Sequence, residues 1–290
     1  MKTKTTHLIL IADSGSTKTR WELLQDGNTA TVYTKGTNPF YQSREDIIAI
    51  VRKELLPQIN AAPDKIFFYG AGISQKDKVA IVQDALQSVF PQARIEVEHD
   101  LLAAARATCG KEPGITCILG TGSNSCLYDG KKIIDNVPSL GFTLGDEGSG
   151  GYFGRKLLQA YYYRELPDDL KKLLEAKHNM QRDHVLNEVY ETNMPNSVVA
   201  AYAGFLSENN PHPFIRSLFA SGFSEFLERH VAKYKGATTL PIHFIGSIAF
   251  LNRSVLEGEL PKLGMRAGII IKSPMEGLVR YHAAADGTAE

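Results

Sequence analysis

Apolar residues follow two different spacings in the first part of the chain. Short apolar or alternating runs, which are typical of β-strands, cover residues 7–12, 19–24, 29–34, 65–69 and 94–98. Apolar residues three or four positions apart, which favour helices, cover residues 44–59, 76–90 and 101–108. Asp26-Gly27 is a typical hairpin turn between the second and third strands. This alternation of strands and helices predicts an α/β domain over residues 1–110.

The pattern of the first 34 residues recurs further along the chain. A strand at 115–119 precedes the small-residue loop Gly120-Thr121-Gly122-Ser123, and a strand at 124–128, the turn Asp129-Gly130 and a strand at 131–134 follow. Strand, loop, strand, turn, strand is also the order near the N-terminus, so the sequence contains an internal repeat. We therefore expect a second domain over residues 111–290.

From Gly145 onward the pattern becomes mostly helical. Helical spacing covers residues 152–164, 168–176, 183–191, 197–207 and 213–233. Strand patterns return at 241–245 and 266–271. We expect a helical insertion at about 150–235 in the second domain, and a last helix at 274–286 that could pack on the first domain. The predicted architecture is two α/β domains, the second with this insertion.

Composition narrows the class of protein. Hydrophobic residues make up 43% of the 290 residues, and 32 basic residues balance 32 acidic ones. This balance gives no support for a nucleic-acid partner or a membrane surface, and no apolar stretch approaches the roughly 18 residues of a membrane span. The apolar run near the N-terminus is too short for a signal peptide. Cys109, Cys117 and Cys126 are too few and too irregular for a disulfide framework, which favours a cytoplasmic protein.

The loop after the first strand is a candidate phosphate site. Asp13 ends the apolar run, and Ser14, Gly15, Ser16, Thr17 and Lys18 follow it. Small residues let backbone N–H groups approach phosphate oxygens, and the hydroxyls of Ser16 and Thr17 add donors. Asp13 could hold Mg²⁺ through water, although a plain tight turn with a capping Asp is the alternative. No P-loop pattern occurs, but a second such hairpin at Gly120–Ser123 could grip the same phosphates from the other side.

Three further segments have both a structural and a functional interpretation. Asp100 opens an alanine-rich helix, so it could cap that helix or act as a general base. Asp146 and Glu147 precede another helix, so they could cap it or accept hydrogen bonds from a polyhydroxyl ligand. Asn38 before Pro39 indicates only a turn.

These motifs, taken in order, resemble a known superfamily over nearly the whole chain. D-S-G-S-T-K-T, G-T-G-S-N, G-D-E-G-S-G and a late Gly246-Ser247 resemble the actin-like ATPases, and within them the BadF/BadG/BcrA/BcrD family, which includes N-acetylglucosamine kinase. The resemblance implies two actin-like (ribonuclease H-like) domains. It also implies ATP-dependent phosphorylation of an amino sugar such as N-acetylglucosamine, on its 6-hydroxyl, with Mg²⁺.

The resemblance also assigns roles to individual residues. It implies that the first hairpin (Ser14 to Lys18) and the second (Gly120, Thr121 and Gly122) bind phosphates, with Gly246 and Ser247 near adenosine. It implies that Asp100 is the catalytic base. The residues implied to contact the sugar are Asn38, Ser123, Asn124, Asp146 and Glu147.

The chain departs from the family pattern at two places. Ser14 and Ser16 replace two glycines of the usual D-G-G-G-T-K-T. The segment from Gly141 to Asp146 is shorter than the usual G-W-G-x-x-x-G-D. N-acetylmuramate, glucosamine and N-acetylmannosamine therefore stay open as acceptors beside N-acetylglucosamine.

Two other functions share this fold. One is an activator ATPase of an acyl-CoA dehydratase or reductase, which bridges a dimer with an iron–sulfur cluster and needs thiolates for it. Cys117 and Cys126, which flank the second loop, are candidate thiolates, although both could instead be buried as apolar residues. A sugar-sensing repressor usually adds a DNA-binding domain, for which a first strand at residue 7 leaves no room. We expect a homodimer whose partners are ATP and a small amino sugar, without nucleic acid or membrane.

Overall fold

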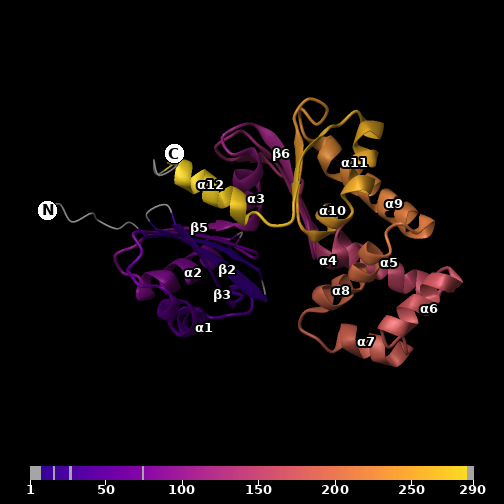
Figure 1. Cartoon of the computed structure of the whole chain (residues 1–290), viewed down its shortest axis with the longest axis horizontal. Coiled ribbons are helices and arrows are strands. Elements are labelled where there is room, and N and C mark those ends of the chain that lie inside the picture. The colour runs from indigo at the N-terminus through magenta and orange to yellow at the C-terminus, as the bar shows by residue number, and fades with distance from the viewer. Residues whose placement is uncertain (1–7, 16, 26–27, 74, 286–290) are drawn as a thin grey trace. The chain divides into compact units, whose positions relative to one another are not determined.

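The computed structural model describes residues 8–15, 17–25, 28–73 and 75–285. The chain divides into two compact units: residues 1–110 together with 274–290, and residues 111–273. Each unit contains one five-stranded sheet with helices packed on it (Figure 1). The turn expected at Asp26-Gly27 lies outside the described residues.

The sheet of the first unit has the strand order β3-β2-β1-β4-β5. Its strands are β1 (Leu8–Ser14), β2 (Lys18–Gln25), β3 (Asn28–Lys35), β4 (Lys65–Gly70) and β5 (Arg94–His99). Strands β1, β2 and β3 are antiparallel neighbours, whereas β4 and β5 run parallel to β1. Asp13 pairs with Arg20 on β2 and with Tyr69 on β4, so these three side chains lie on one face of the sheet.

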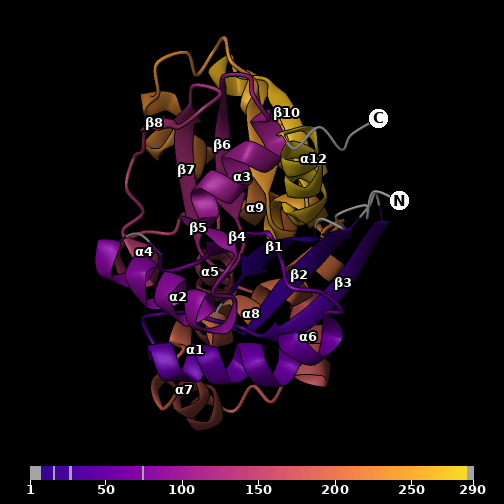
Figure 2. The same ribbon diagram turned by 90° about the vertical axis from the view of Figure 1, so that its left-hand side faces the viewer.

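Helices cover both faces of this sheet (Figures 1 and 2). They are α1 (Arg44–Ile50), α2 (Lys76–Val89), α3 (Asp100–Cys109) and α12 (Met275–Ala285). Leu8, Leu10 and Ala12 of β1 are buried in one hydrophobic cluster with residues of α1 and α2. The opposite face, which carries Asp13, packs against α3 and α12. Gly277 lets α12 approach α3 closely, because a Cβ there would overlap the Ala107 carbonyl.

The helix predicted at 44–59 is not one regular helix. It begins with a capping box between Ser43 and Asp46, and α1 ends at Ile50. A π-helical turn (Val51–Leu55) and a 3₁₀ turn (Leu56–Gln58) follow. Pro57 has no N–H to donate, so regular α-helical bonding cannot continue through this residue.

The sheet of the second unit repeats the first in connectivity. Its strands are β6 (Gly114–Leu119), β7 (Ser123–Tyr128), β8 (Ile133–Asp135), β9 (Ile242–Ile245) and β10 (Ala267–Ile271). They have the order β10-β9-β6-β7-β8, with β6, β7 and β8 antiparallel and β9 and β10 parallel to β6. This is the order and direction of β1 to β5, so the predicted internal repeat is confirmed.

Most helices of the second unit lie between β8 and β9 in sequence. They are α4 (Gly141–Leu144), α5 (Gly150–Tyr162), α6 (Asp168–Lys177), α7 (Arg182–Tyr190), α8 (Pro195–Glu208) and α9 (Pro213–Arg229). Two more, α10 (Ser247–Leu251) and α11 (Arg253–Glu259), follow β9. The sequence does not predict α4, because a segment of four residues is too short to show a hydrophobic periodicity. Within the described part of the chain, none of these helices is long and apolar enough to cross a bilayer.

Candidate active site

Two carboxylates lie at the same edge of the first sheet. Asp13 is close to the end of β1, and Asp100 directly follows β5. Because β1, β4 and β5 are parallel neighbours, both residues lie at the carboxyl ends of strands about 10 Å apart. Both are half-buried. The carboxyl edge of parallel strands is where α/β proteins commonly bind ligands, so this pair is a candidate reaction centre.

The environment makes both carboxylates harder to ionise. Burial and the charge of Asp100, with a smaller effect from Glu276, raise the pKa of Asp13 to about 6, against the opposing effect of Arg20. Burial also raises the pKa of Asp100, although His99 and nearby backbone N–H groups act in the opposite direction. A bound cation, or a ligand that donates a hydrogen bond, would therefore stabilise the charged form of each carboxylate.

Asp100 does not cap its helix. The N-cap of α3 is His99, whose Nδ1 accepts a hydrogen bond from the Leu102 N–H at 3.3 Å. The capping interpretation of Asp100 is therefore wrong, and its carboxylate stands at the first helical position. Burial lowers the pKa of His99, consistent with a neutral ring that can accept this bond. The sequence does not indicate that His99 caps the helix, because histidine is not among the usual capping residues.

The donor set at this edge fits Mg²⁺. Mg²⁺ prefers hard oxygen ligands and commonly takes one or two carboxylates from the protein, with phosphate and water completing its shell. Asp13 and Asp100 offer such oxygens. The two carboxylates repel each other when both are ionised, and a divalent cation between them would reduce this repulsion. The described residues contain no cluster of three or more His, Cys, Asp or Glu suited to a metal, so a site built only from protein ligands is not found among them.

The first hairpin turn presents exposed small residues. The Gly15 N–H donates to the Lys18 carbonyl at 3.0 Å and closes the turn between β1 and β2. Gly15, Thr17 and Lys18 are exposed, and the Lys18 ammonium lies 3.6 Å from the centre of the Tyr33 ring. Ser16, predicted to donate to phosphate, lies outside the described residues.

Ser14 differs from its neighbours in this turn. Its side chain is buried, and Oγ lies 2.7 Å from Thr19 Oγ1 and 2.8 Å from Thr37 Oγ1. These contacts direct the Ser14 hydroxyl into the unit, in contrast to the exposed residues that follow it. The sequence alone could not indicate this, because Thr37 approaches from a separate loop.

The loop at Gly36–Asn38 is a compact turn joined to the first hairpin. The Gly36 N–H donates to the Thr17 carbonyl at 3.0 Å. Asn38 is buried, and its Oδ1 accepts from the Phe40 N–H at 3.0 Å, while its own N–H donates to Gln42 Oε1 at 2.9 Å. Asn38 thus forms the turn that its position before Pro39 indicated.

In the second unit, the turn at Gly120–Gly122 connects β6 and β7. The Gly120 N–H donates to the Gly122 carbonyl at 3.0 Å, and the first N–H groups of α5 donate to the carbonyls of Gly120 and Thr121 at 2.8 and 3.0 Å. Gly246, which ends β9, has φ +123°, and a Cβ there would overlap the Leu119 carbonyl. Glycine is therefore required at 246, and it brings Gly246-Ser247 beside the second hairpin turn.

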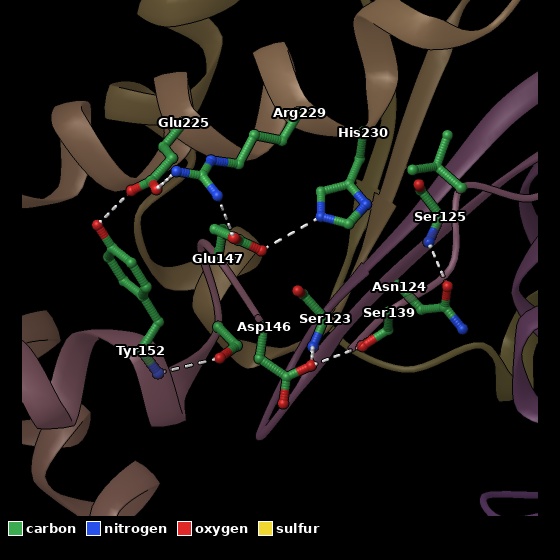
Figure 3. A network of polar contacts seen from close by, with 12 residues as sticks. Ser123, Asn124, Ser125, Ser139, Asp146, Glu147, Tyr152, Glu225, Arg229 and His230 are labelled. Carbon is green, nitrogen blue, oxygen red and sulfur yellow. Dashed lines mark hydrogen bonds and ion pairs between the residues drawn. The ribbon is translucent and has the colours of Figure 1, made fainter. Parts of the chain in front are cut away.

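Asp146 lies against the second hairpin turn. Its Oδ1 accepts from the Ser123 N–H at 3.3 Å and from the Ser139 hydroxyl at 2.8 Å (Figure 3). Its Oδ2 lies 3.0 Å from the position that a Cβ atom at residue 122 would occupy. Asp146 has φ +59°, a left-handed conformation that is uncommon for a residue with a side chain. Such strain persists where the surroundings fix it and is concentrated at functional sites.

Glu147 points away from Asp146 and toward α9 (Figure 3). Its Oε1 lies 3.2 Å from the Arg229 guanidinium, and its Oε2 lies 3.2 Å from His230 Nε2. Arg229 also pairs with Glu225 at 2.8 Å. The Glu147 side chain is only 9% exposed, so these contacts hold the loop on α9.

Neither Asp146 nor Glu147 caps helix α5. The N-cap is Ser149, whose hydroxyl accepts from the Tyr152 N–H at 3.1 Å. The capping interpretation of the two acids is therefore wrong, which leaves the Asp146 carboxylate at the hairpin turn.

Ser123 and Asn124 differ in how their side chains are used. Asn124 Oδ1 accepts from the Ser125 N–H at 2.9 Å and from Asn136 Nδ2 at 3.1 Å. The Ser123 hydroxyl is buried and has no hydrogen-bond partner among the described residues. A buried polar group without a partner is costly, so Ser123 Oγ is suited to a ligand or a water molecule.

Within each unit, the predicted residues gather at one end of the sheet. The first unit brings together Asp13, Asp100 and the two loops at 14–18 and 36–38. The second brings together the turn at 120–123, Asp146 and Gly246.

All three cysteines are buried, Cys117 and Cys126 completely, so none presents a thiol at the surface for an iron–sulfur cluster that would bridge a dimer.

Two sheets of identical connectivity, each with a small-residue hairpin turn at the carboxyl end of its central strand, define a two-domain α/β protein of the actin-like fold. No protein-family model and no curated protein matches the chain. Solved structures do match. A protein from Porphyromonas gingivalis proposed to be an N-acetylglucosamine kinase is 41% identical, with 96% of this chain and 99% of that chain covered and a TM-score of 0.91. The chain belongs to the family of this protein.

More distant structures share the fold. A Chromobacterium violaceum protein, also proposed to be an N-acetylglucosamine kinase, is 17% identical, with 95% and 98% of the two chains covered and a TM-score of 0.72. A ROK-family glucokinase from Streptomyces griseus, in complex with glucose and AMPPNP, is 15% identical, with 96% and 98% covered and a TM-score of 0.53.

Proposed function

We propose that this protein is an ATP-dependent sugar kinase that transfers the γ-phosphoryl group to a hydroxyl of an amino sugar such as N-acetylglucosamine, at its 6-position. The 41% identity to a protein proposed to have this activity supports the substrate class. The observation that carries the proposal is Asp100: a half-buried carboxylate directly after a strand, at the first position of a helix whose N-cap is His99, and close enough to Asp13 to raise the pKa of Asp13. We place the protein in the BadF/BadG/BcrA/BcrD group by its motifs.

Asp100 would act as the general base. The attacking hydroxyl must lose its proton as its bond to phosphorus forms, and a positioned carboxylate can accept that proton. A pKa raised by burial makes Asp100 a better proton acceptor than an ordinary aspartate.

Asp13 would hold Mg²⁺, directly or through water. The ion would supply positive charge that neutralises the negative charge of the phosphates. Asp13 contributes a half-buried carboxylate whose ionised form the neighbouring Arg20 favours.

Backbone N–H groups at the two small-residue loops would bind phosphates, except those of Gly15 and Gly120, which donate to carbonyls of their own turns. The residues proposed at the first loop are Gly15, Ser16, Thr17 and Lys18, of which Ser16 lies outside the described residues, and those at the second are Gly120, Thr121 and Gly122. Small residues at such turns let the backbone approach phosphate oxygens. Gly246 and Ser247, which lie beside the second turn, would contact the adenosine.

We infer the candidate sugar contacts separately for each unit. Asp146, which keeps Oδ2 beside the second turn, and Ser123, whose hydroxyl is buried without a partner, are the best supported. Asn38 and Asn124 are further candidates. The contacts of Glu147 with Arg229 and His230 favour a role in fixing Asp146 over a direct bond to the sugar.

A coupled ADP-release assay over a panel of amino sugars and hexoses tests the proposal. We expect sugar-dependent ADP release that Asp100→Asn lowers by about 10²- to 10⁴-fold, because the amide cannot accept the proton. The matched control is Asp84→Asn, which removes an exposed carboxylate on α2 of the same unit. Full activity of Asp100→Asn would contradict the role of the base. Sugar-independent ATP hydrolysis across the whole panel would contradict the kinase function itself.

A further inference from the structure

Three buried hydroxyl groups meet beneath the first hairpin turn. Ser14 ends β1, Thr19 is its partner on β2, and Thr37 belongs to the loop at 36–38. Their side chains are at most 2% exposed. Ser14 Oγ lies 2.7 Å from Thr19 Oγ1 and 2.8 Å from Thr37 Oγ1. We name Ser14, Thr19 and Thr37 the hydroxyl cluster.

The donors and acceptors of the cluster fit together. The Thr37 N–H donates to Ser14 Oγ at 3.1 Å. The Thr19 hydroxyl lies 3.2 Å from the Lys35 carbonyl and can donate to it, which leaves Thr19 Oγ1 free to accept from Ser14. Thr37 can then donate its hydroxyl proton to Ser14 Oγ. The Ser14 hydroxyl also lies 3.1 Å from the Thr37 carbonyl, to which it can donate instead of to Thr19. Ser14 is thus the centre of the cluster, and its bonds with Thr37 are lost without its hydroxyl.

The cluster joins two functional loops of the first unit. On one side, Ser14 directly follows Asp13 and begins the turn at 14–18. On the other side, Thr37 directly precedes Asn38, whose side chain shapes the turn at 38–42. A buried hydrogen-bonded cluster has few alternative arrangements, because any partner that is lost leaves a buried polar group unsatisfied.

We propose that Ser14 is a positioning residue for the sugar acceptor: through the cluster it fixes the loop at 36–38 relative to Asp13. This rests on the proposed kinase function. It assigns to Ser14 a task different from that of the exposed residues 15, 17 and 18, because the Ser14 hydroxyl is directed away from the surface on which a phosphate would lie. Removing the hydroxyl should therefore affect binding of the sugar and not of ATP.

Kinetics of Ser14→Ala, Thr37→Val and the double variant test this assignment. We expect each single variant to raise the KM for the sugar by about three- to tenfold, the amount that one or two buried hydrogen bonds support, while the KM for ATP changes less than twofold. Because the two side chains act through one contact, the double variant should be no worse than the poorer single variant. The matched control is Thr108→Val, which removes a buried hydroxyl of α3 that donates to the Ala104 carbonyl.

Two outcomes would overturn the assignment. One is an equal rise in the KM for ATP in Ser14→Ala, which would mean that Ser14 serves the phosphates. The other is multiplication of the two single effects in the double variant, which would mean that the residues act independently. The bond from the Gly36 N–H to the Thr17 carbonyl remains in every variant, so the loop keeps an attachment to the hairpin.

Hydrogen exchange of the ligand-free protein separates this inference from the proposed function. Amides at 36–42 should exchange about three- to tenfold faster in Ser14→Ala than in the parent protein, and unchanged in Thr108→Val. If the parent phosphorylates no sugar, the kinase function is wrong, and this measurement still decides whether Ser14 holds the loop. Unchanged exchange in Ser14→Ala would refute the positioning role whatever the activity.

Discussion

Replacing Asp13 by asparagine should stabilise the first unit in the absence of metal and nucleotide. The pKa of Asp13 rises from 3.8 to about 6 on folding, mainly through burial and the charge of Asp100. A group whose pKa is higher in the folded state binds its proton more tightly there, so its ionisation lowers stability. The stability that its proton provides is complete below pH 3.8 and is lost as the pH rises through 6.

The magnitude follows from the two pKa values. A rise of about two pH units corresponds to about 3 kcal/mol in the free energy of unfolding at pH 8. At pH 5, where folded Asp13 is mostly protonated, the same relation gives about half of that. Asparagine has no charge to bury, although its amide still needs hydrogen bonds, so we expect a gain of about 1 to 3 kcal/mol at pH 8. The gain should shrink steadily toward pH 5.

Trp21 makes this measurable in one unit of a two-unit chain. It is the only tryptophan of the protein, and it is completely buried on β2 beside the hairpin that carries Asp13. Urea unfolding followed by its fluorescence therefore reports the first unit. The measurement is made with EDTA from pH 5 to pH 8, with Asp84→Asn as the exposed control. A gain that is independent of pH, or a loss of stability at pH 8, would refute the electrostatic reasoning. Adding Mg²⁺ and ATP should then stabilise the parent more than Asp13→Asn.

The remaining predictions concern the second unit. Gly246→Ala should destabilise it by about 2 to 3 kcal/mol, because φ is +123° and the new methyl group overlaps the Leu119 carbonyl. Thermal melts followed by circular dichroism test this. The control is Gly258→Ala on α11, which should melt like the parent because its new methyl group meets no neighbour. Burial lowers the pKa of His243 to about 4, and its Nδ1 accepts from the Ile269 N–H at 2.9 Å. Because this pKa is lowered on folding, the stability that the neutral ring provides is complete above pH 6.5 and is lost as the pH falls toward 4, by about 3 kcal/mol. Chemical unfolding from pH 7 to pH 4.5 should show a much smaller loss in His243→Asn than in the parent. An equal loss in the two proteins would exclude His243 as the cause.

The repeated connectivity could be predicted from sequence because it depends on patterns of neighbouring residues. Apolar runs, small-residue loops and Asp-Gly turns follow one another in the same order twice, and turn type and strand alternation are properties of neighbouring residues. The same locality explains why Asp13 could be placed near a strand end, since an apolar run precedes it directly.

The contacts that decide individual roles could not be predicted in this way. Glu147 is engaged by Arg229 and His230, more than 80 residues later, and nothing near Glu147 indicates this. Ser14 meets Thr37 only because a loop folds under the hairpin. For Asp100, the deciding fact is that the preceding His99 satisfies the helix N-terminus, an unusual choice that propensities do not favour.

The return of α12 to the first unit has a consequence for how the chain is made. His282, close to the end of the sequence, is buried in the first unit, where its Nε2 lies 2.8 Å from the Tyr69 hydroxyl and its ring stacks on Phe67. During synthesis, the ribosome releases residues 1–110 long before this helix exists. The sheet face that carries Asp13 is therefore covered by α3 but not by α12 until the whole second unit has been translated.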